Sequence, residues 1–419
     1  MKLRAVLLSV FLAATLFAAG APPVVAPRGP EFYLMAGDTS HVTRVAMDQG
    51  GTFLGLFHNV FAGWVGARGG SADGLLPGFS VGPGARGANV AAVAAGEFVI
   101  SWGQMQGYDT GYEYVVMRPF TTDGTPTGPE RAVSEGPTHN IGAATAIGSR
   151  PDAFLVIWEE WSPTPPIESE LRGRFMPLSG APAPSFQVNT WTTGSQTTPR
   201  LATSPDGSLL AVWRSSSCSP DDPSSGCIRA RHFDRSGQPS GADFRVNSVT
   251  TNAQNSPDVA WVGGGYAVVW ASYDCDPRCV RGRLVDAIGA VRGEDFLVDE
   301  AGGAAADSPG VAGVPSGDFV VTWDRSLAGD SLAFARAFGA EGLPQTPEFQ
   351  VNSDTSSEPY ETAVAMNDTG NFVVVWSDAY NMWGRSFDFN LDLFADGFES
   401  GDTSGWDSEV GGRGVIERD

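Results

Sequence analysis

The chain has 419 residues, of which 42% are hydrophobic and 11% aromatic, so global disorder is excluded and a substantial core is possible. The net charge is −22 and Lys2 is the only lysine, which excludes nucleic acid and anionic membrane surfaces as partners. Glycine (53) and proline (29) are frequent without a collagen period, which favours many short strands joined by tight turns.

Residues 1–26 have the composition of a signal peptide. Lys2 and Arg4 give a basic start, and residues 5–19 form an apolar run that is short for a membrane span. Cleavage could follow Ala21 or Ala26, and no later segment approaches 18 continuous apolar residues. We therefore predict an exported protein, extracellular or on the cell surface, without membrane insertion.

The next feature is a repeat, because six short apolar runs share one form and end in tryptophan. They are FVISW, FLVIW, LLAVW, YAVVW, FVVTW and FVVVW, ending at Trp102, Trp158, Trp213, Trp270, Trp323 and Trp376. A weaker copy, FLGLF, ends at Phe57 and is followed by an atypical glycine-rich stretch. The count is thus seven units, or six units and one irregular unit.

Each unit reads as four strands, A to D, separated by turn residues. The run that ends in tryptophan is strand B, and motifs such as IRARHFDRSG (228–237) and DFRVN (243–247) supply strands C and D. Strand B is apolar at consecutive positions, so both of its faces must be covered. Sheets stacked around an axis provide this cover, which predicts an all-β, seven-bladed β-propeller. A β-sandwich array or solenoid is the alternative, but it would leave two hydrophobic end faces.

The last repeat lacks strand D, and the beginning of the chain resembles the missing piece. PEFYLM (30–35) matches PEFQVN (347–352). We predict that residues 31–35 pair with strand C of the last blade and close the ring, so that no blade has an unpaired edge. The propeller then covers residues 31–389, and residues 390–419 form an acidic C-terminal tail.

The pattern PxVA…DGxFVVVW…IxARxFDxxGxxxGxxFxVN resembles a repeat of exported bacterial proteins, often surface or calcium-associated ones. This resemblance covers nearly all of residues 31–389 and implies a β-propeller-type repeat protein, but its matching residues are structural and imply little about activity. The segment LFADGFESGDTSGW (393–406) is similar to a C-terminal signature of some secreted bacterial proteins.

The four cysteines fall into two close pairs, each within one B–C loop. In an exported protein, Cys218 with Cys227 and Cys275 with Cys279 predict two local disulfides. The alternative is a four-cysteine zinc site between adjacent blades.

No recognisable catalytic constellation is visible. The four histidines are scattered, no GxSxG or phosphate-binding loop occurs, and SPDGSLLAVW (204–213) fits the sialidase aspartate box poorly. We read that segment as a turn before a core strand, and the repeated tryptophans as core. No cofactor is predicted and the metal content is unknown. Calcium is possible through scattered loop carboxylates, although no EF-hand or glycine-aspartate nonapeptide is present.

The long B–C and D–A loops lie on one rim of such a ring, and loops on a rigid scaffold are where binding usually resides. Five aromatic residues could offer flat faces to sugars or peptides: Tyr108, Tyr112, Trp161, Trp191 and Tyr273. Five acids could bind cations or polar ligands: Asp109, Glu159, Glu160, Asp221 and Asp222.

These observations favour a secreted or cell-surface binding module that recognises protein or glycan through this rim, and a non-enzyme over an enzyme. We expect a monomer. Two alternatives stay open: a glycoside hydrolase or lyase with its site in the central channel, and a purely structural envelope component.

Overall fold

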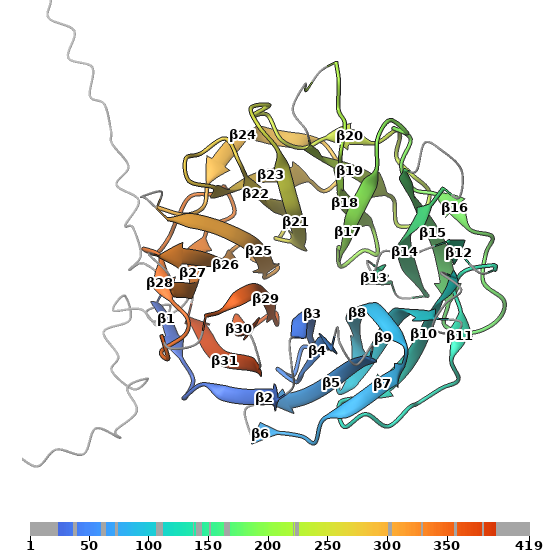
Figure 1. Ribbon diagram of the computed structural model, residues 1–419, viewed down its shortest axis with the longest axis horizontal. Coiled ribbons are helices and arrows are strands. Elements are labelled where there is room, and N and C mark those ends of the chain that lie inside the picture. The colour runs from blue at the N-terminus through green and yellow to red at the C-terminus, as the bar shows by residue number, and fades with distance from the viewer. Residues whose placement is uncertain are drawn as a thin grey trace, which may run out of the picture.

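Seven antiparallel sheets surround a central axis, and the apolar runs of the repeat form the second strand of each sheet (Figure 1). The computed structural model describes residues 24–36, 40–59, 64–71, 74–105, 112–136, 138–139, 145–150, 152–162, 168–220, 222, 226–300, 304–327, 330–355, 358–378 and 381–390. Strand A of each blade lies at the hub, and strands B, C and D follow outward. The predicted seven-bladed β-propeller is confirmed. None of the regular segments in these ranges is a helix that could cross a membrane.

The first three blades hold β3 to β16. Blade 1 contains β3 (Ser40–Met47), β4 (Phe53–Asn59), β5 (Trp64–Ser71), β6 (Gly74–Leu75) and β7 (Phe79–Pro83). Blade 2 contains β8 (Ala85–Ala94), β9 (Glu97–Met105), β10 (Tyr112–Thr121), β11 (Arg131–Ala132) and β12 (Thr138–His139). Blade 3 contains β13 (Thr145–Ser149), β14 (Ala153–Trp161), β15 (Ser169–Pro177) and β16 (Phe186–Gln187).

The other four blades hold β17 to β31. Blade 4 contains β17 (Gln196–Thr203), β18 (Leu209–Ser215), β19 (Cys227–Phe233) and β20 (Phe244–Arg245). Blade 5 contains β21 (Gln254–Trp261), β22 (Gly265–Ser272), β23 (Cys279–Asp286) and β24 (Val291–Leu297). Blade 6 contains β25 (Ala305–Gly313), β26 (Phe319–Leu327), β27 (Asp330–Phe338) and β28 (Phe349–Gln350). Blade 7 contains β29 (Tyr360–Met366), β30 (Asn371–Ser377) and β31 (Asn381–Asn390), joined by β1 (Val24–Pro27) and β2 (Phe32–Ala36). Blade 1 is thus a complete blade despite its atypical sequence.

The repeated tryptophans form the core between blades, as predicted. All six are buried. Trp323 and Phe319 of blade 6 pack in one cluster with Val269 of blade 5. Strand B of blade 6 is therefore covered by the sheet of the neighbouring blade. A ring gives every blade two such neighbours, which is why an open stack with bare end faces does not form. The interface between consecutive blades is called a seam below.

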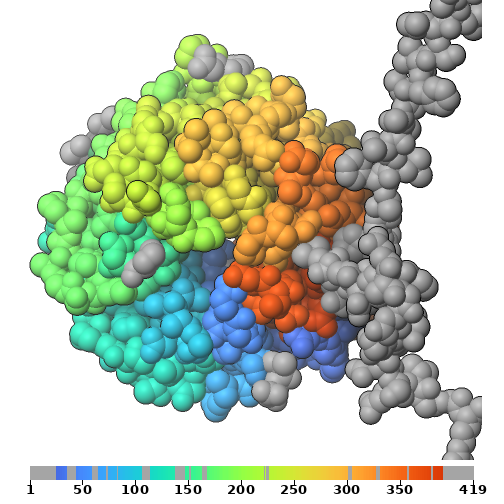
Figure 2. All heavy atoms as spheres, turned by 180° about the vertical axis from the view of Figure 1, so that it is seen from behind, coloured from blue at the N-terminus to red at the C-terminus, as the bar shows by residue number. Residues whose placement is uncertain are grey.

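The start of the chain closes the ring at the seam between blades 7 and 1, where the blue β2 lies beside the orange-red β31 (Figure 1). β2 pairs with β31 in antiparallel register, Phe32 opposite Gly384 and Tyr33 opposite Trp383. β1 continues the pairing along the same strand, from Pro27 opposite Phe387 onward. The latch is therefore longer than the predicted residues 31–35, and it begins within the segment predicted as leader. Seen from behind, the first and last blades meet directly (Figure 2).

Side chains show that β2 replaces a true strand D. Leu34 offers its carbonyl oxygen to Arg68 of blade 1 at 2.9 Å. A matching contact, from an arginine of strand C to a backbone carbonyl of the preceding strand D, recurs around the ring. It joins Arg231 to Val188, Arg283 to Val246, Arg336 to Val298 and Arg385 to Val351. In these four seams the residue after that carbonyl is asparagine or aspartate, whereas Met35 follows Leu34.

The acid before Phe32 also follows the repeat. Glu31 accepts hydrogen bonds from the backbone and hydroxyl of Ser353. Asp295 accepts the backbone N–H of Ser248 in the same way, at the seam between blades 4 and 5. Each acid ties its strand D to the segment that follows the preceding strand D, so the latch reproduces two of the recurring seam contacts.

Candidate active site in the central channel

The inner strands are bulged near their first residues, at the rim where the B–C and D–A loops lie. Register shifts occur in β17, β21, β25 and β29. At each shift one residue other than glycine has positive φ, between 48° and 53° at Thr198, Ser256, Ser308 and Glu361. Such conformations cost about 1 kcal/mol or more and persist only where the surroundings enforce them. The bulges re-aim the following residues toward the channel.

Two buried acids hold two of these bulges from the preceding blade. Glu159 follows Trp158 in strand B, and its Oε1 accepts the N–H of Thr198 at 2.6 Å. Asp324 follows Trp323 at the equivalent place, and its Oδ1 accepts the N–H of Glu361 at 3.3 Å. Each acid therefore fixes a strained turn across a seam.

Burial perturbs both carboxyl groups. It raises the pKa of Glu159 to about 8, against the single hydrogen bond from Thr198. Burial also raises the pKa of Asp324 to about 6, and the charges of Asp307 and Glu361 add to the effect. Carboxyl groups that are neutral near pH 6 are the kind that donate protons in acid catalysis.

Directly below the bulges, a polar layer lines a cavity of about 170 Å³ in the channel. Its polar side chains come from inner strands of different blades: Arg44, Asn89, Arg200, Asp258 and Thr362. The next layer is apolar, with one residue from each of the seven blades: Val45, Val90, Ile147, Leu201, Val259, Val311 and Val364. The cavity thus combines converging charged groups with an apolar base, as ligand sites commonly do.

Asp258 is the acid of this layer. Its Oδ2 accepts the N–H of Val311 at 2.9 Å, and Arg200 Nε lies 3.8 Å from its Oδ1. Although it sits deep in the ring, a quarter of its side chain is exposed to the cavity. Burial raises the pKa of Asp258 to about 6, despite the hydrogen bond from Val311 and the positive charge of Arg44.

Arg44 connects two acids. Burial lowers the pKa of Arg44, and the negative charges of Asp258 and Glu361 both act in the opposite direction. The guanidinium therefore lies within the field of Asp258 from blade 5 and of Glu361 from blade 7. Asp258 and Arg44 line the cavity together, so an acid and a cation are available there for acid–base work.

A further ion pair lies at the rim between blades 5 and 6. Arg278 Nη1 contacts Asp307 Oδ2 at 2.5 Å and donates to the Tyr273 hydroxyl at 3.1 Å. The guanidinium also stands 5.3 Å from the Tyr273 ring centroid. Asp307 precedes the bulge residue Ser308, so this cluster borders the same channel mouth.

The aromatic residues predicted to bind ligands do not form one patch where their placement is described. Trp191 donates through Nε1 to Ser217 O at 2.8 Å and stacks on Arg229 at 5.0 Å, so it covers the disulfide loop of blade 4. Trp161 is half-buried at the end of β14, and Tyr273 is in the rim cluster. Tyr112 begins β10, and Tyr108 lies outside the described residues. Their role in binding stays a prediction.

Of the acids predicted on the loops, two are internal. Glu159 holds a bulge, and Asp222 is buried and accepts from the Asn247 side chain at 3.1 Å. Glu160 pairs with Arg172 at 3.6 Å near the surface. Asp109 and Asp221 lie outside the described residues. Sequence reasoning missed Asp258 and Arg44, which line the channel cavity, and Glu361 and Asp324, which meet at a bulge.

Both predicted cysteine pairs are disulfides. Cys218 and Cys227 have Cα atoms 6.3 Å apart, and those of Cys275 and Cys279 are 5.7 Å apart. The four-cysteine zinc site is therefore excluded, because every sulfur atom is already bonded. Disulfides are typical of proteins outside the reducing cytosol.

No family model and no curated protein matches the chain. An α-L-arabinanase of Penicillium chrysogenum, solved with arabinobiose, is 12% identical over 86% of this chain and 99% of its own, with a TM-score of 0.53. A puromycin hydrolase mutant is 16% identical over 84% of this chain and 54% of its own, with a TM-score of 0.52. A GH93 α-L-arabinofuranosidase of Fusarium graminearum is 11% identical over 85% of this chain and 98% of its own, with a TM-score of 0.49. At these identities the likeness shows the fold.

The prediction of a non-catalytic binding module is wrong in the light of these findings. The solved rings that align along almost their whole length include glycoside-cleaving proteins. The physical reason for the error is that variable loops are visible in a sequence, whereas acids brought together by bulged inner strands are not. The converging groups of this protein lie in the channel, whereas Trp191 and Tyr273 at the rim make separate contacts with Ser217 and Arg278.

Proposed function

We propose that the protein is a glycoside hydrolase whose active site is the channel cavity lined by Arg44, Arg200 and Asp258. The observation that carries the proposal is a pair of acids from different blades within the field of one buried arginine. Asp258 has a pKa near 6 and faces the cavity, and Glu361 acts on the same Arg44. The fold shared with an arabinanase supports this choice of reaction.

In this proposal Asp258 is the proton donor and Glu361 the ionised partner. The protonated Asp258 carboxyl gives its proton to the glycosidic oxygen as the bond from that oxygen to the anomeric carbon breaks. The Glu361 carboxylate faces the positive charge that develops on the sugar. A water oxygen finally bonds to the anomeric carbon, and the proton it loses restores the acid. Asp324 positions Glu361 by accepting its backbone N–H at the bulge.

The test is a panel of arabinan, other plant and bacterial polysaccharides and nitrophenyl glycosides, assayed for released sugar. We expect activity on at least one glycoside, with an alkaline limb of kcat/KM near pH 6 as Asp258 loses its proton. Asp258→Asn and Glu361→Gln should each lower kcat by about 10²- to 10⁴-fold. Asp368→Asn, in an exposed turn, is the matched control. NMR of the first-formed anomer then tells retention from inversion.

Two results would reject the proposal. One is the absence of sugar release across the panel by protein that is folded by circular dichroism. The other is an active protein whose Asp258→Asn variant stays within about threefold of wild type, since a proton donor contributes at least 10²-fold.

Export to the cell exterior and independence from cofactors are part of the same proposal. The two disulfides suit an oxidising compartment, and polysaccharide substrates lie outside the cell. The acid pair and Arg44 supply the charges that the reaction needs, so we expect chelator treatment to leave activity unchanged. A loss of activity that added calcium restores would show that calcium is required.

A further inference from the structure

The seam that closes the ring lacks a side chain that the other blades possess. In each blade the first large residue of strand B stands opposite a residue near the end of strand C. In six blades the strand C residue is apolar and large or β-branched: Phe120, Met176, Phe233, Val285, Phe338 and Phe387. In blade 1 it is Gly70, opposite Phe53.

In four seams that strand C residue is a phenylalanine that packs on a phenylalanine from strand D of the preceding blade. The ring centroids are 5.6 to 5.9 Å apart in the pairs Phe79–Phe120, Phe186–Phe233, Phe296–Phe338 and Phe349–Phe387. At the closing seam Phe32 takes the strand D place and stacks on Phe53, at 5.6 Å. Leu75 and Phe53 close over Gly70, each with an atom 2.8 Å from the position of a Cβ. The layer of side chains at this seam is therefore one ring short.

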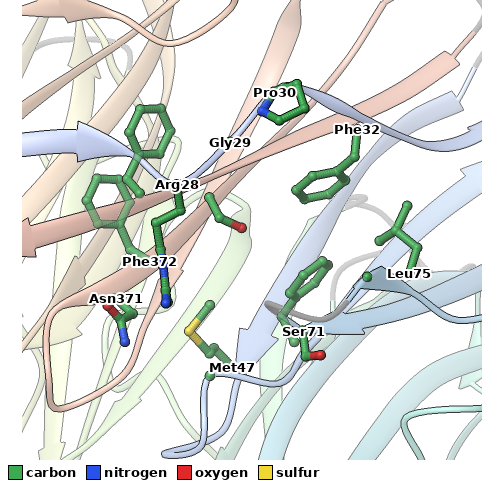
Figure 3. A pocket seen from close by; sticks show the side chains of 14 residues that line it. Arg28, Gly29, Pro30, Phe32, Met47, Ser71, Leu75, Asn371 and Phe372 are labelled. Atoms are coloured by element: carbon green, nitrogen blue, oxygen red, sulfur yellow. The ribbon is translucent and has the colours of Figure 1, made fainter. Parts of the chain in front are cut away.

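A cavity of about 490 Å³ lies beside these residues (Figure 3). Its apolar walls come from blades 1 and 7 and from the latch: Phe32, Met47, Phe53, Leu75, Phe372 and Phe387. It opens between the A–B and C–D turns, on the opposite rim from the bulges. Its volume is within the range of small-molecule sites, and a mostly apolar wall with few polar groups is typical of them.

Arg28 supplies the charge at this cavity. Its backbone N–H donates to Ser386 O at 2.9 Å, which fixes the chain at the step between β1 and β2. Its Nε lies 3.1 Å from Asp388 Oδ1, and about a third of each side chain is exposed. Figure 3 shows the arginine side chain extending into the cavity. A guanidinium has five N–H donors, so the contact through Nε leaves terminal donors for an anion.

We propose that this cavity binds a small aromatic carboxylate. The ring enters the layer of phenylalanine side chains that is incomplete at this seam, where edge-to-face or offset contacts with Phe32 and Phe53 are favourable. The carboxylate meets Arg28 at the mouth. This site is separate from the channel and does not depend on the hydrolase proposal.

The probe is phenylacetate, with benzyl alcohol as its uncharged counterpart, and binding is measured by titration calorimetry on the full chain. We expect one phenylacetate per protein and weaker binding of benzyl alcohol. Ser386→Phe places a ring in the cavity and should abolish binding of both probes. Arg28→Met should weaken phenylacetate by about tenfold or more and leave benzyl alcohol unchanged. Arg292→Met, which removes an exposed arginine paired with Glu341, should change neither.

The proposal is overturned if wild-type protein fails to bind phenylacetate at millimolar concentration. It is also overturned if Ser386→Phe, folded by circular dichroism, binds phenylacetate as wild type does, because the ligand would then lie elsewhere. Binding that Arg28→Met leaves unchanged would refute the carboxylate assignment. Hydrolase activity is expected to be unaffected in both variants, so failure of this proposal and of the channel proposal are distinguishable.

Discussion

Replacing Glu159 with glutamine should make the protein more stable at high pH and leave it unchanged at low pH. Glu159 is 3% exposed, and burial raises its pKa to about 8. In the unfolded chain it titrates near 4.3. The folded state therefore binds this proton more tightly, and the stabilisation from it is complete below about pH 4 and lost as the pH rises through about 8.

The magnitude follows from the two pKa values. They differ by between three and four units, and each unit corresponds to about 1.4 kcal/mol, which gives about 5 kcal/mol as the upper limit at pH 8 to 9. Glutamine stays neutral and keeps an oxygen that can accept the Thr198 N–H. Glu159→Gln should thus raise the unfolding free energy by roughly 2–5 kcal/mol at pH 8.5 and by less than about 1 kcal/mol at pH 4.5.

Urea titrations at pH 4.5, 6.5 and 8.5 measure the difference in unfolding free energy between the two proteins. It appears as a shift of the urea midpoint while the dependence of free energy on urea stays the same. Glu160→Gln is the control, because it removes one negative charge from the next residue of the same strand, where the side chain pairs with Arg172 near the surface. If the wild-type and Glu159→Gln midpoints run in parallel from pH 4.5 to 8.5, then Glu159 is not held neutral by the fold and the reasoning is refuted.

Three further predictions concern the ring and its staples. Arg68→Met removes the contact to Leu34 O at the closing seam and should cost about 1–3 kcal/mol in urea unfolding, whereas a loss below about 0.3 kcal/mol would show that the latch does not need it. Replacing both Cys218 and Cys227 with serine should cost about 2.7 kcal/mol, and the shorter Cys275–Cys279 loop about 2.1 kcal/mol, so a reversed order in thermal unfolding would contradict the chain-entropy argument. Mass spectrometry of the exported protein should find the new N-terminus after Ala21, because cleavage after Ala26 would remove most of β1. A chain that begins at Pro27 should unfold at a lower urea concentration.

Much of the fold could be predicted because its determinants are local and repeated. Consecutive apolar residues ending in tryptophan predict a strand that is covered on both faces. The likeness of residues 30–35 to residues 347–352 predicts the latch. The extension by β1 could not be seen, because VVAP has no counterpart in the repeat and looks like the end of a leader.

The channel site was hidden for a geometric reason. Asp258 lies in PDVAWV, an apolar strand by composition, and only the positive φ of Ser256 re-aims the residues that follow it. A weak signal does exist in three blades, where a proline at the bulge is followed by one variable residue and then by an apolar one. The variable residues are Arg200, Asp258 and Gly310. Glu159 and Asp324 gave a second signal, as acids directly behind buried tryptophans.

The latch also dictates the order in which the molecule can be completed. The Tyr33 hydroxyl bonds to Asn381, 348 positions away, so β2 leaves the ribosome long before its partner β31. Contacts this remote are slow to form, and until they do β31 presents a bare hydrogen-bonding edge that invites pairing with another molecule. An exported chain would face this hazard after translocation, when both of its ends are on the same side of the membrane. A chaperone that shields the edge of β31 would then raise the yield of native protein more than one that acts on another blade.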